Sequence, residues 1–263
     1  MSQGNSTDSL NAGIAAATLI LFSEHDGAQA RHLMIQRSAQ MNFAPNALVF
    51  PGGRVDEDDH RIAGDPSLID VTLADPVELA HRITAIRETL EEVGIQVGFS
   101  TTTSLDPATM QAALKDKSPF SSLLAATGTR LDLSGIVPWA KWHPRFKSHR
   151  QFDTRFYIAR HDGGHSVNVD IDEVGHARWL HSHEAIAEAD DGRAKVIFPT
   201  LCNLERLSAY PTFEAALAHA AAFECRPISP RLEDDLHGDT WISIPEDRGY
   251  PVARRLVSSL QAP

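Results

Sequence analysis

The sequence is poor in cysteine and in positive charge, and each shortage excludes a class of protein. Two cysteines, Cys202 and Cys225, occur in 263 residues, too few for the disulfide framework of a small secreted domain. Lys and Arg number 24 against 35 Asp and Glu, which gives a net charge of −11. Such a balance argues against a general surface for nucleic acid or for an anionic membrane.

Long hydrophobic runs and targeting segments are also missing from the sequence. The apolar segment 14–22 is too short to span a bilayer and suits a buried strand. Residues 1–13 lack the basic start and apolar core of a signal peptide, and the sequence ends Gln-Ala-Pro, without a peroxisomal address. We therefore expect a cytoplasmic protein with neither a membrane nor a nucleic acid as partner.

Residues 87–95, Arg-Glu-Thr-Leu-Glu-Glu-Val-Gly-Ile, hold the main chemical signal. Glu88, Glu91 and Glu92 fall within an arc of roughly 100° on one side of a helix, opposite an apolar side. Their repulsion costs a few tenths of a kcal/mol per pair, and a hard divalent cation with oxygen ligands would relieve it. Taken alone, such a stripe is more often the solvated acidic side of an amphipathic helix than a metal site.

The sequence before this stripe supplies a structural context. Residues 46–50 are typical of a short buried strand, and Gly52 and Gly53 follow in what we expect to be a tight turn whose N–H groups can approach a ligand. A helix of about 18 residues should then begin after Asp75, with Pro76 first and Glu78 completing a capping box, and end at Gly94.

Residues 50–53 together with 87–95 resemble the Nudix box, G-x5-E-x7-R-E-U-x-E-E-x-G-U, where U is aliphatic. Thr89 at the first U position is a mild departure. Gly53 lies 34 positions before Arg87 (87 − 53), so about 20 residues are inserted into the pattern. Counted back from Arg87, the first glutamate of the box falls on Leu79. Glu78 and the acidic run 56–59 are the candidates for its role.

A split box of this kind is similar to the branch of Nudix hydrolases that contains the peroxisomal coenzyme A diphosphatase, as are residues 142–144 and 150–158. The resemblance covers most of residues 14–215. It implies an α/β fold, the Nudix α/β/α sandwich with a mixed sheet, an insertion in the box and a C-terminal helical extension. We divide the chain into a flexible tail (1–12), a Nudix domain (13–195, with the insertion at 54–74) and a helical extension packed on that domain (196–263).

The resemblance also implies a metal-dependent hydrolase that cleaves a diphosphate linkage in a nucleoside diphosphate derivative, with Mg²⁺ or Mn²⁺ as cofactor. Coenzyme A or an acyl-coenzyme A is a candidate substrate, and a homodimer is one option for assembly. The alternative is a catalytically weak Nudix-fold module that binds nucleotides or regulates. The missing first glutamate favours that alternative, whereas the complete set of three glutamates favours the enzyme.

Site residues follow from the same resemblance. The expected metal ligands, which are also catalytic, are Glu88, Glu91 and Glu92; Arg87 should orient a glutamate through a bidentate pair. Glu173 is a candidate general base, or an ordinary surface glutamate. The expected substrate-binding residues are Gly52, Gly53, Arg37, Arg150 and Arg155. Arg155 could instead form a structural pair with Asp153 or Glu173.

Periodicity predicts the remaining elements. Strands are expected at 14–22, 32–37, 136–142, 152–160, 173–180 and 240–244. Helices are expected at 66–72, 106–116, 119–127 and 182–189, with two more in 199–223 broken at Tyr210-Pro211.

Overall fold

The computed structural model describes residues 13–24, 29–40, 44–70, 75–100, 105–143, 151–163, 167–169 and 173–260. The predicted tail, 1–12, and Arg150 lie outside these described residues. Within them, no helix is long and apolar enough to cross a membrane.

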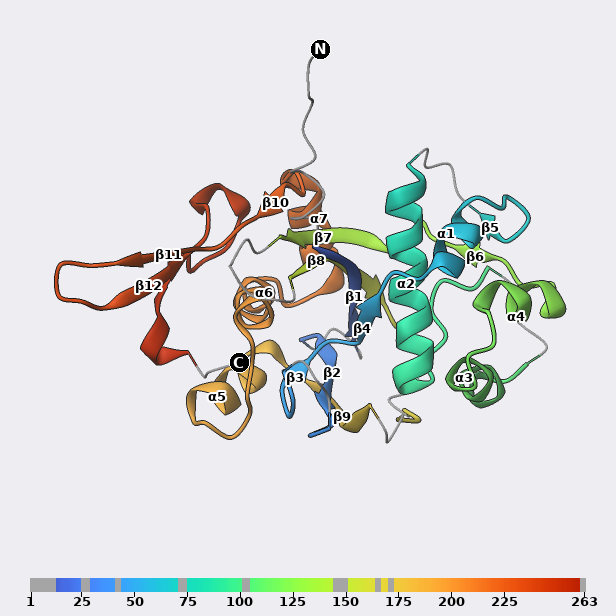
Figure 1. Ribbon diagram of the computed structural model, residues 1–263, viewed down its shortest axis with the longest axis horizontal. Helices are drawn as coiled ribbons and strands as arrows, with labels where there is room; N and C mark the ends of the chain where they lie inside the picture. Colours follow the sequence, from blue (N-terminus) through green and yellow to red (C-terminus); the bar gives the residue numbers. More distant parts are fainter. Residues whose placement is uncertain are drawn as a thin grey trace, which may run out of the picture.

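A mixed sheet forms the centre of the molecule (Figure 1). Its strands follow the order β10-β7-β8-β1-β2-β3, with β4 paired to β1 and β9 paired to β2. The central strand, β1 (Ile14–Ser23), runs parallel to β8 (Phe152–Arg160) and antiparallel to β4 (Gly52–Arg54). Apolar side chains point from β1 to both faces, which is the pattern of a strand covered on each side.

Two helical layers cover the sheet. Ala17, Leu19 and Leu21 pack into one core cluster with α2 (Pro76–Val93) and with α1 (Glu57–Ala63), α3 (Pro107–Lys115) and α4 (Phe120–Thr127). Ile20 and Phe22 enter a second cluster with α5 (Ser182–Asp190), α6 (Phe198–Ser208) and α7 (Phe213–Ala222). The predicted α/β/α sandwich with a mixed sheet is therefore confirmed.

Helix α2 begins and ends where the sequence predicts. The Asp75 side chain accepts a hydrogen bond from the Val77 N–H at 2.9 Å, and Gly94 ends the helix with φ +70°. Glu78, however, closes no capping box. Its two oxygens bind Arg82 and Arg155 instead.

Most of the other elements lie close to their predicted ranges. The strands are β2 (Arg31–Arg37), β3 (Leu48–Val49), β7 (Val137–Trp142), β9 (Val174–Leu180) and β12 (Thr240–Ser243). The two helices predicted in 199–223 are α6 and α7.

The insertion at 54–74 differs from its prediction. The helix expected at 66–72 is wrong in its described part, where a turn leads into β5 (Ile69–Asp70), parallel to β6 (Leu131–Asp132). The helix in this segment is α1, whose residues Asp59 and Ile62 are fully buried. The segment is thus partly core, because α1 packs on α2 and shields apolar surface that an exposed loop would leave open.

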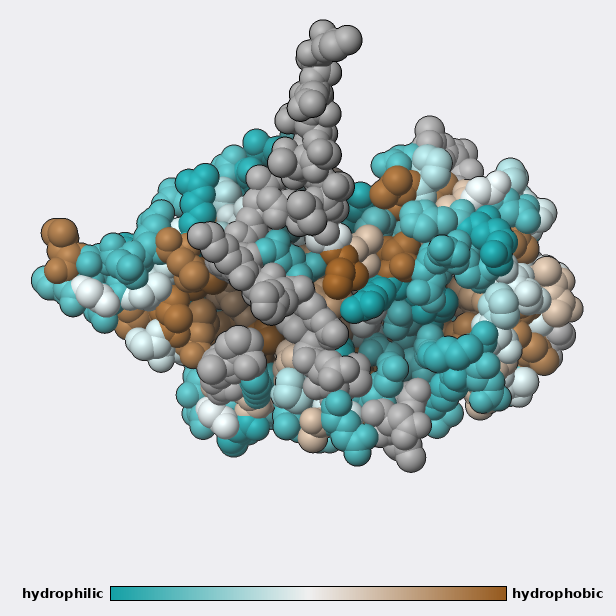
Figure 2. Space-filling view, viewed as in Figure 1, coloured by the Kyte–Doolittle hydropathy of each residue, from teal (hydrophilic) through white to brown (hydrophobic). Residues whose placement is uncertain are grey.

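The predicted helical extension, 196–263, is helical only in its first part. After α7 come β10 (Pro227–Ile228) and a three-stranded antiparallel sheet of β11 (Arg231–Asp234), β12 and β13 (Arg254–Leu256). Hydrophobic colour gathers at this end of the molecule in Figure 2, where Leu236 and Leu232 are exposed, whereas the α1–α4 side is mostly hydrophilic.

A buried polar network fastens the extension to the sheet. Asn203 of α6 has no exposed surface, and its Oδ1 accepts hydrogen bonds from Trp139 Nε1 at 3.0 Å and Tyr250 Oη at 2.9 Å. Trp142 Nε1 in turn donates to Tyr250 Oη at 3.2 Å. These contacts join strand β7, helix α6 and the segment between β12 and β13.

Asn203→Leu should destabilise the protein by about 3 kcal/mol, because it leaves the Trp139 N–H and the Tyr250 hydroxyl buried without their acceptor. Urea denaturation measures this difference. A cost for Asn203→Leu below about 1 kcal/mol would contradict the assignment.

Candidate active site

The site begins with two glycines that the chain needs for close packing. Strand β4 pairs with β1 so that Gly52 lies opposite Thr18 and Gly53 opposite Ala17. A Cβ on Gly53 would stand 2.4 Å from the Glu88 carboxylate, and one on Gly52 would stand 2.4 Å from the Ala17 carbonyl oxygen. The expected glycine turn is therefore a strand. Its glycines let the helix carboxylates approach the backbone.

The three predicted glutamates meet against this strand. Glu92 Oε2 accepts the Gly52 N–H at 2.9 Å, and Glu88 Oε1 accepts from Arg87 Nη1 at 2.8 Å. Glu91 lies between two cations, with Oε2 3.4 Å from Arg87 Nη1 and Oε1 3.2 Å from Lys117 Nζ. Glu91 and Glu92 are buried, so the stripe is not the solvated face of an ordinary amphipathic helix.

Burial and mutual repulsion perturb these carboxyl groups. Burial raises the pKa of Glu88 to about 7; Arg87 opposes this rise and the charge of Glu91 adds to it. Burial, and then the charge of Glu88, hold the pKa of Glu92 well above its usual range. Negative charge at this place is therefore incompletely compensated by the nitrogen groups around it.

Arg87 is the organising cation of the cluster. Its Nε and Nη2 bind the two oxygens of Asp59, each at 2.9 Å, and Nη2 also donates to the Arg54 carbonyl at 2.9 Å. Burial lowers the pKa of Arg87, but the hydrogen bonds to Asp59 and the neighbouring carboxylates outweigh it and raise that pKa overall. The expected bidentate pair exists, but its partner is Asp59 and not a glutamate of the box.

Asp59 also occupies the position of the first box glutamate, if the pattern is counted forward from Gly53. Six positions after Gly53, where G-x5-E places its glutamate, the residue is Asp59, so the inserted residues lie between Asp59 and Arg87. Leu79, the position counted backwards, is in the core. Glu78 lies about 15 Å from Glu88 along the helix axis, so it is too distant to serve. Counting forward from the glycine would have found Asp59 in the sequence.

Of the other predicted site residues, Arg37 and Glu173 influence the carboxylate cluster, whereas Arg155 is paired away from it. The charge of Arg37 lowers the pKa of Glu92 and that of Glu173 raises it, so both side chains act on the cluster. Arg155 binds Glu78 near the start of α2, which is neither of the two partners expected for it. It is thereby held at the opposite end of α2 from Glu91 and Glu92.

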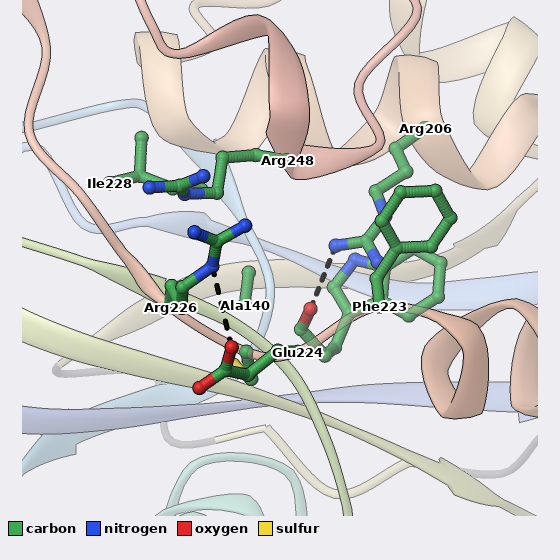
Figure 3. Close-up of a pocket in the computed structure, with 9 residues that line it drawn as sticks. Ala140, Arg206, Phe223, Glu224, Arg226, Ile228 and Arg248 are labelled. Atoms are coloured by element: carbon green, nitrogen blue, oxygen red, sulfur yellow. Dashed lines mark hydrogen bonds and ion pairs between the residues drawn. The ribbon is translucent and has the colours of Figure 1, made fainter.

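A pocket lies elsewhere, between β7, α6 and the segment that follows α7 (Figure 3). Arg206 donates to the Trp139 carbonyl there, and Arg226 pairs with Glu224. Its lining contains none of the box residues. The box residues therefore meet where α2 contacts β4, and this pocket is separate from them.

Comparison with known proteins agrees with the fold. No family model matches the chain. Nudix hydrolase 7 of Caenorhabditis elegans is 28% identical over 199 residues, covering 74% of this chain and 60% of that protein. Acyl-coenzyme A diphosphatase NUDT19 of Xenopus laevis is 26% identical over 223 residues, covering 66% of this chain and 59% of that protein. The chain thus spans about three fifths of the length of these curated relatives.

A solved structure also has the same fold. The crystal structure of a Nudix hydrolase from Alicyclobacillus acidocaldarius superposes with a TM-score of 0.71 at 25% identity, over 80% of this chain and 97% of that one. The sandwich, the glycine strand and the acidic helix therefore define a Nudix fold with a split box. The chain is thus similar to Nudix hydrolases in sequence and in fold.

Asp59→Asn should cost about 2 to 3 kcal/mol of stability, because it removes the charge that Nε and Nη2 of the buried Arg87 bind and leaves Glu88 and Glu91 as the close charged partners of that guanidinium. Thermal or urea unfolding measures this change. Asp56→Asn is the matched control, since Asp56 touches the same guanidinium at 3.7 Å from an exposed position and should cost less than about 1 kcal/mol. Equal effects of the two substitutions would contradict the role given to Asp59.

Proposed function

We propose that the protein is a metal-dependent hydrolase that cleaves a diphosphate linkage. The observation that carries this proposal is the meeting of the buried Glu91 and Glu92 with the partly buried Glu88 against the glycine strand, with the pKa of Glu88 and of Glu92 raised. Buried like charges cost stability unless something compensates them, so their presence together favours a functional cause.

The donor chemistry of the cluster fits Mg²⁺ or Mn²⁺, which prefer carboxylate oxygens. Among the described residues, no three His, Cys, Asp or Glu side chains converge as a preformed metal site. Each carboxylate of the cluster has a nitrogen partner instead, and Glu88, Glu91 and Glu92 are the residues that would hold the ions. When bound, such ions neutralise phosphate oxygens and lower the pKa of a water molecule.

The protein's own residues supply position and charge. Asp59 fixes Arg87, which in turn fixes Glu88 and Glu91, while the Gly52 N–H fixes Glu92. Arg37 is proposed to bind a phosphate of the substrate, since guanidinium groups suit phosphate oxygens. Glu173 is proposed as the general base that accepts a proton from the attacking water.

Coenzyme A or an acyl-coenzyme A is the proposed substrate. The split box supports this class, as does the likeness to a relative named acyl-coenzyme A diphosphatase. The alternative, a binding module without turnover, was favoured by a vacant glutamate position, and Asp59 provides a carboxylate there. We therefore retain the hydrolase as the one proposed function.

A panel of diphosphates with Mg²⁺ and with Mn²⁺ tests the proposal, with the products identified by mass. We expect cleavage of the diphosphate linkage of coenzyme A or acetyl-coenzyme A into two phosphate-bearing products. Turnover that prefers a nucleotide sugar would change the substrate but keep the activity. Binding of these compounds without any turnover would support the binding module.

Glu91→Gln and Glu92→Gln should each lower turnover at least about a hundredfold while the fold stays intact, because each removes a carboxylate that would hold a metal ion. Rates are compared per folded protein, with circular dichroism as the check on folding. Glu78→Gln is the control on the same helix: it breaks ion pairs to Arg82 and Arg155 but should leave turnover nearly unchanged. Near-normal rates for both box variants would remove these two residues from the mechanism.

A further inference from the structure

Helix α3 ends in a motif in which the residue after the C-cap, here Lys117, is usually glycine. The N–H of Lys117 donates to the Leu114 carbonyl at 2.8 Å, and the N–H of Ser118 donates to the Ala113 carbonyl at 2.9 Å. This pair of bonds is the Schellman motif, and it places Lys117 at φ +62°. A side chain disfavours that backbone region, so lysine is a costly residue here.

Two neighbouring helices have glycine at the corresponding position. Helix α2 ends at Gly94 with φ +70°, and α4 ends at Gly128 with φ +64°. At Gly128 an added Cβ would meet nothing within 4 Å, so the backbone conformation and not crowding accounts for the glycine. Glycine at position 117 would suit α3 in the same way, and the fold therefore gives no reason for the lysine.

The side chain of Lys117 supplies a reason. Its Nζ lies 3.2 Å from Glu91 Oε1, at the candidate metal cluster, although the side chain is 78% exposed. An ion pair with so exposed a partner contributes little to stability. Unfavourable backbone conformations of this kind are found where a side chain is needed for function.

The two cations on Glu91 differ in their freedom to move. The Arg87 side chain is 6% exposed and is held by Asp59 and by the Arg54 carbonyl. Lys117 reaches Glu91 from the surface on a flexible four-carbon chain. If another cation takes Glu91, Lys117 is the partner that can leave, and its charge is then next to whatever anion binds there.

We propose that Lys117 is a substrate-binding residue: its ammonium group holds Glu91 in the metal-free protein and contacts a diphosphate oxygen once divalent cations bind Glu91. The proposal rests on the proposed function, because it assigns Lys117 to the same site. The ligand class is a diphosphate, whose oxygens attract a mobile point charge. Two consequences follow, since Lys117 competes with the metal but assists the anion.

Metal and anion binding can be measured without turnover. Calorimetry would titrate Mn²⁺ alone, and then methylene diphosphonate in the presence of Mn²⁺, into the wild type and Lys117→Met. We expect Lys117→Met to bind Mn²⁺ as tightly as the wild type or severalfold tighter, and the diphosphonate about tenfold more weakly. Lys115→Met, which removes the same charge two positions earlier in α3, should change neither affinity.

Lys117→Gly distinguishes the effect of the side chain on binding from the effect of the backbone conformation on stability. It should raise Tm by about 2 °C, because glycine suits the positive φ, and should weaken diphosphonate binding as much as Lys117→Met does. Gly128→Lys, the reverse change at an equivalent helix end, should lower Tm.

Unchanged diphosphonate affinity in both Lys117 variants, or no binding of the diphosphonate to the wild type with Mn²⁺, would overturn the proposal. Weaker Mn²⁺ binding in Lys117→Met would also overturn it, because it would make the lysine a support for Glu91. The proposed function fails by a different result: no turnover of any diphosphate in the panel.

Discussion

The buried pair between Arg87 and Asp59 is the contact on which the arrangement of the box depends. A guanidinium in a dry environment requires a charged partner with matching geometry, and Asp59 provides both oxygens at 2.9 Å. The same group holds the Arg54 carbonyl of β4 and the carboxylate of Glu88. One cation thereby connects α1, α2 and the glycine strand, and it holds the box carboxylates of α2 against that strand.

The parts that the sequence predicts well are those whose causes are local. The boundaries of helix α2 are set by Asp75, Pro76 and Gly94, since capping depends on residues within one turn of each end. Its acidic and apolar faces follow from helical periodicity, which is enough to group Glu88, Glu91 and Glu92 on one side. Strand β1 is equally predictable, because a short apolar segment suits a strand with both faces covered.

The parts that the sequence does not predict depend on contacts between distant segments. Counting forward from Gly53 picks out Asp59, but the burial of its carboxylate against Arg87 depends on the packing of α1 on α2. Arg155 binds Glu78, 77 positions away, instead of either predicted partner. Of the sheet of β11 to β13 only β12 is predicted, because β11 is short and exposed and β13 has three residues. The strain at Lys117 is a property of φ, and no residue pattern reveals it.

The place at which the box is interrupted also bears on how the protein folds. Asp59 and Arg87 are 28 positions apart, so their pair closes a loop that an uninterrupted box would keep short. The entropy lost in closing a loop rises only slowly with its length, so native stability tolerates the extra residues. Folding rate is more sensitive, since contacts between distant positions slow the search for the native state. The inserted residues should therefore slow folding more than they lower the stability of the folded protein.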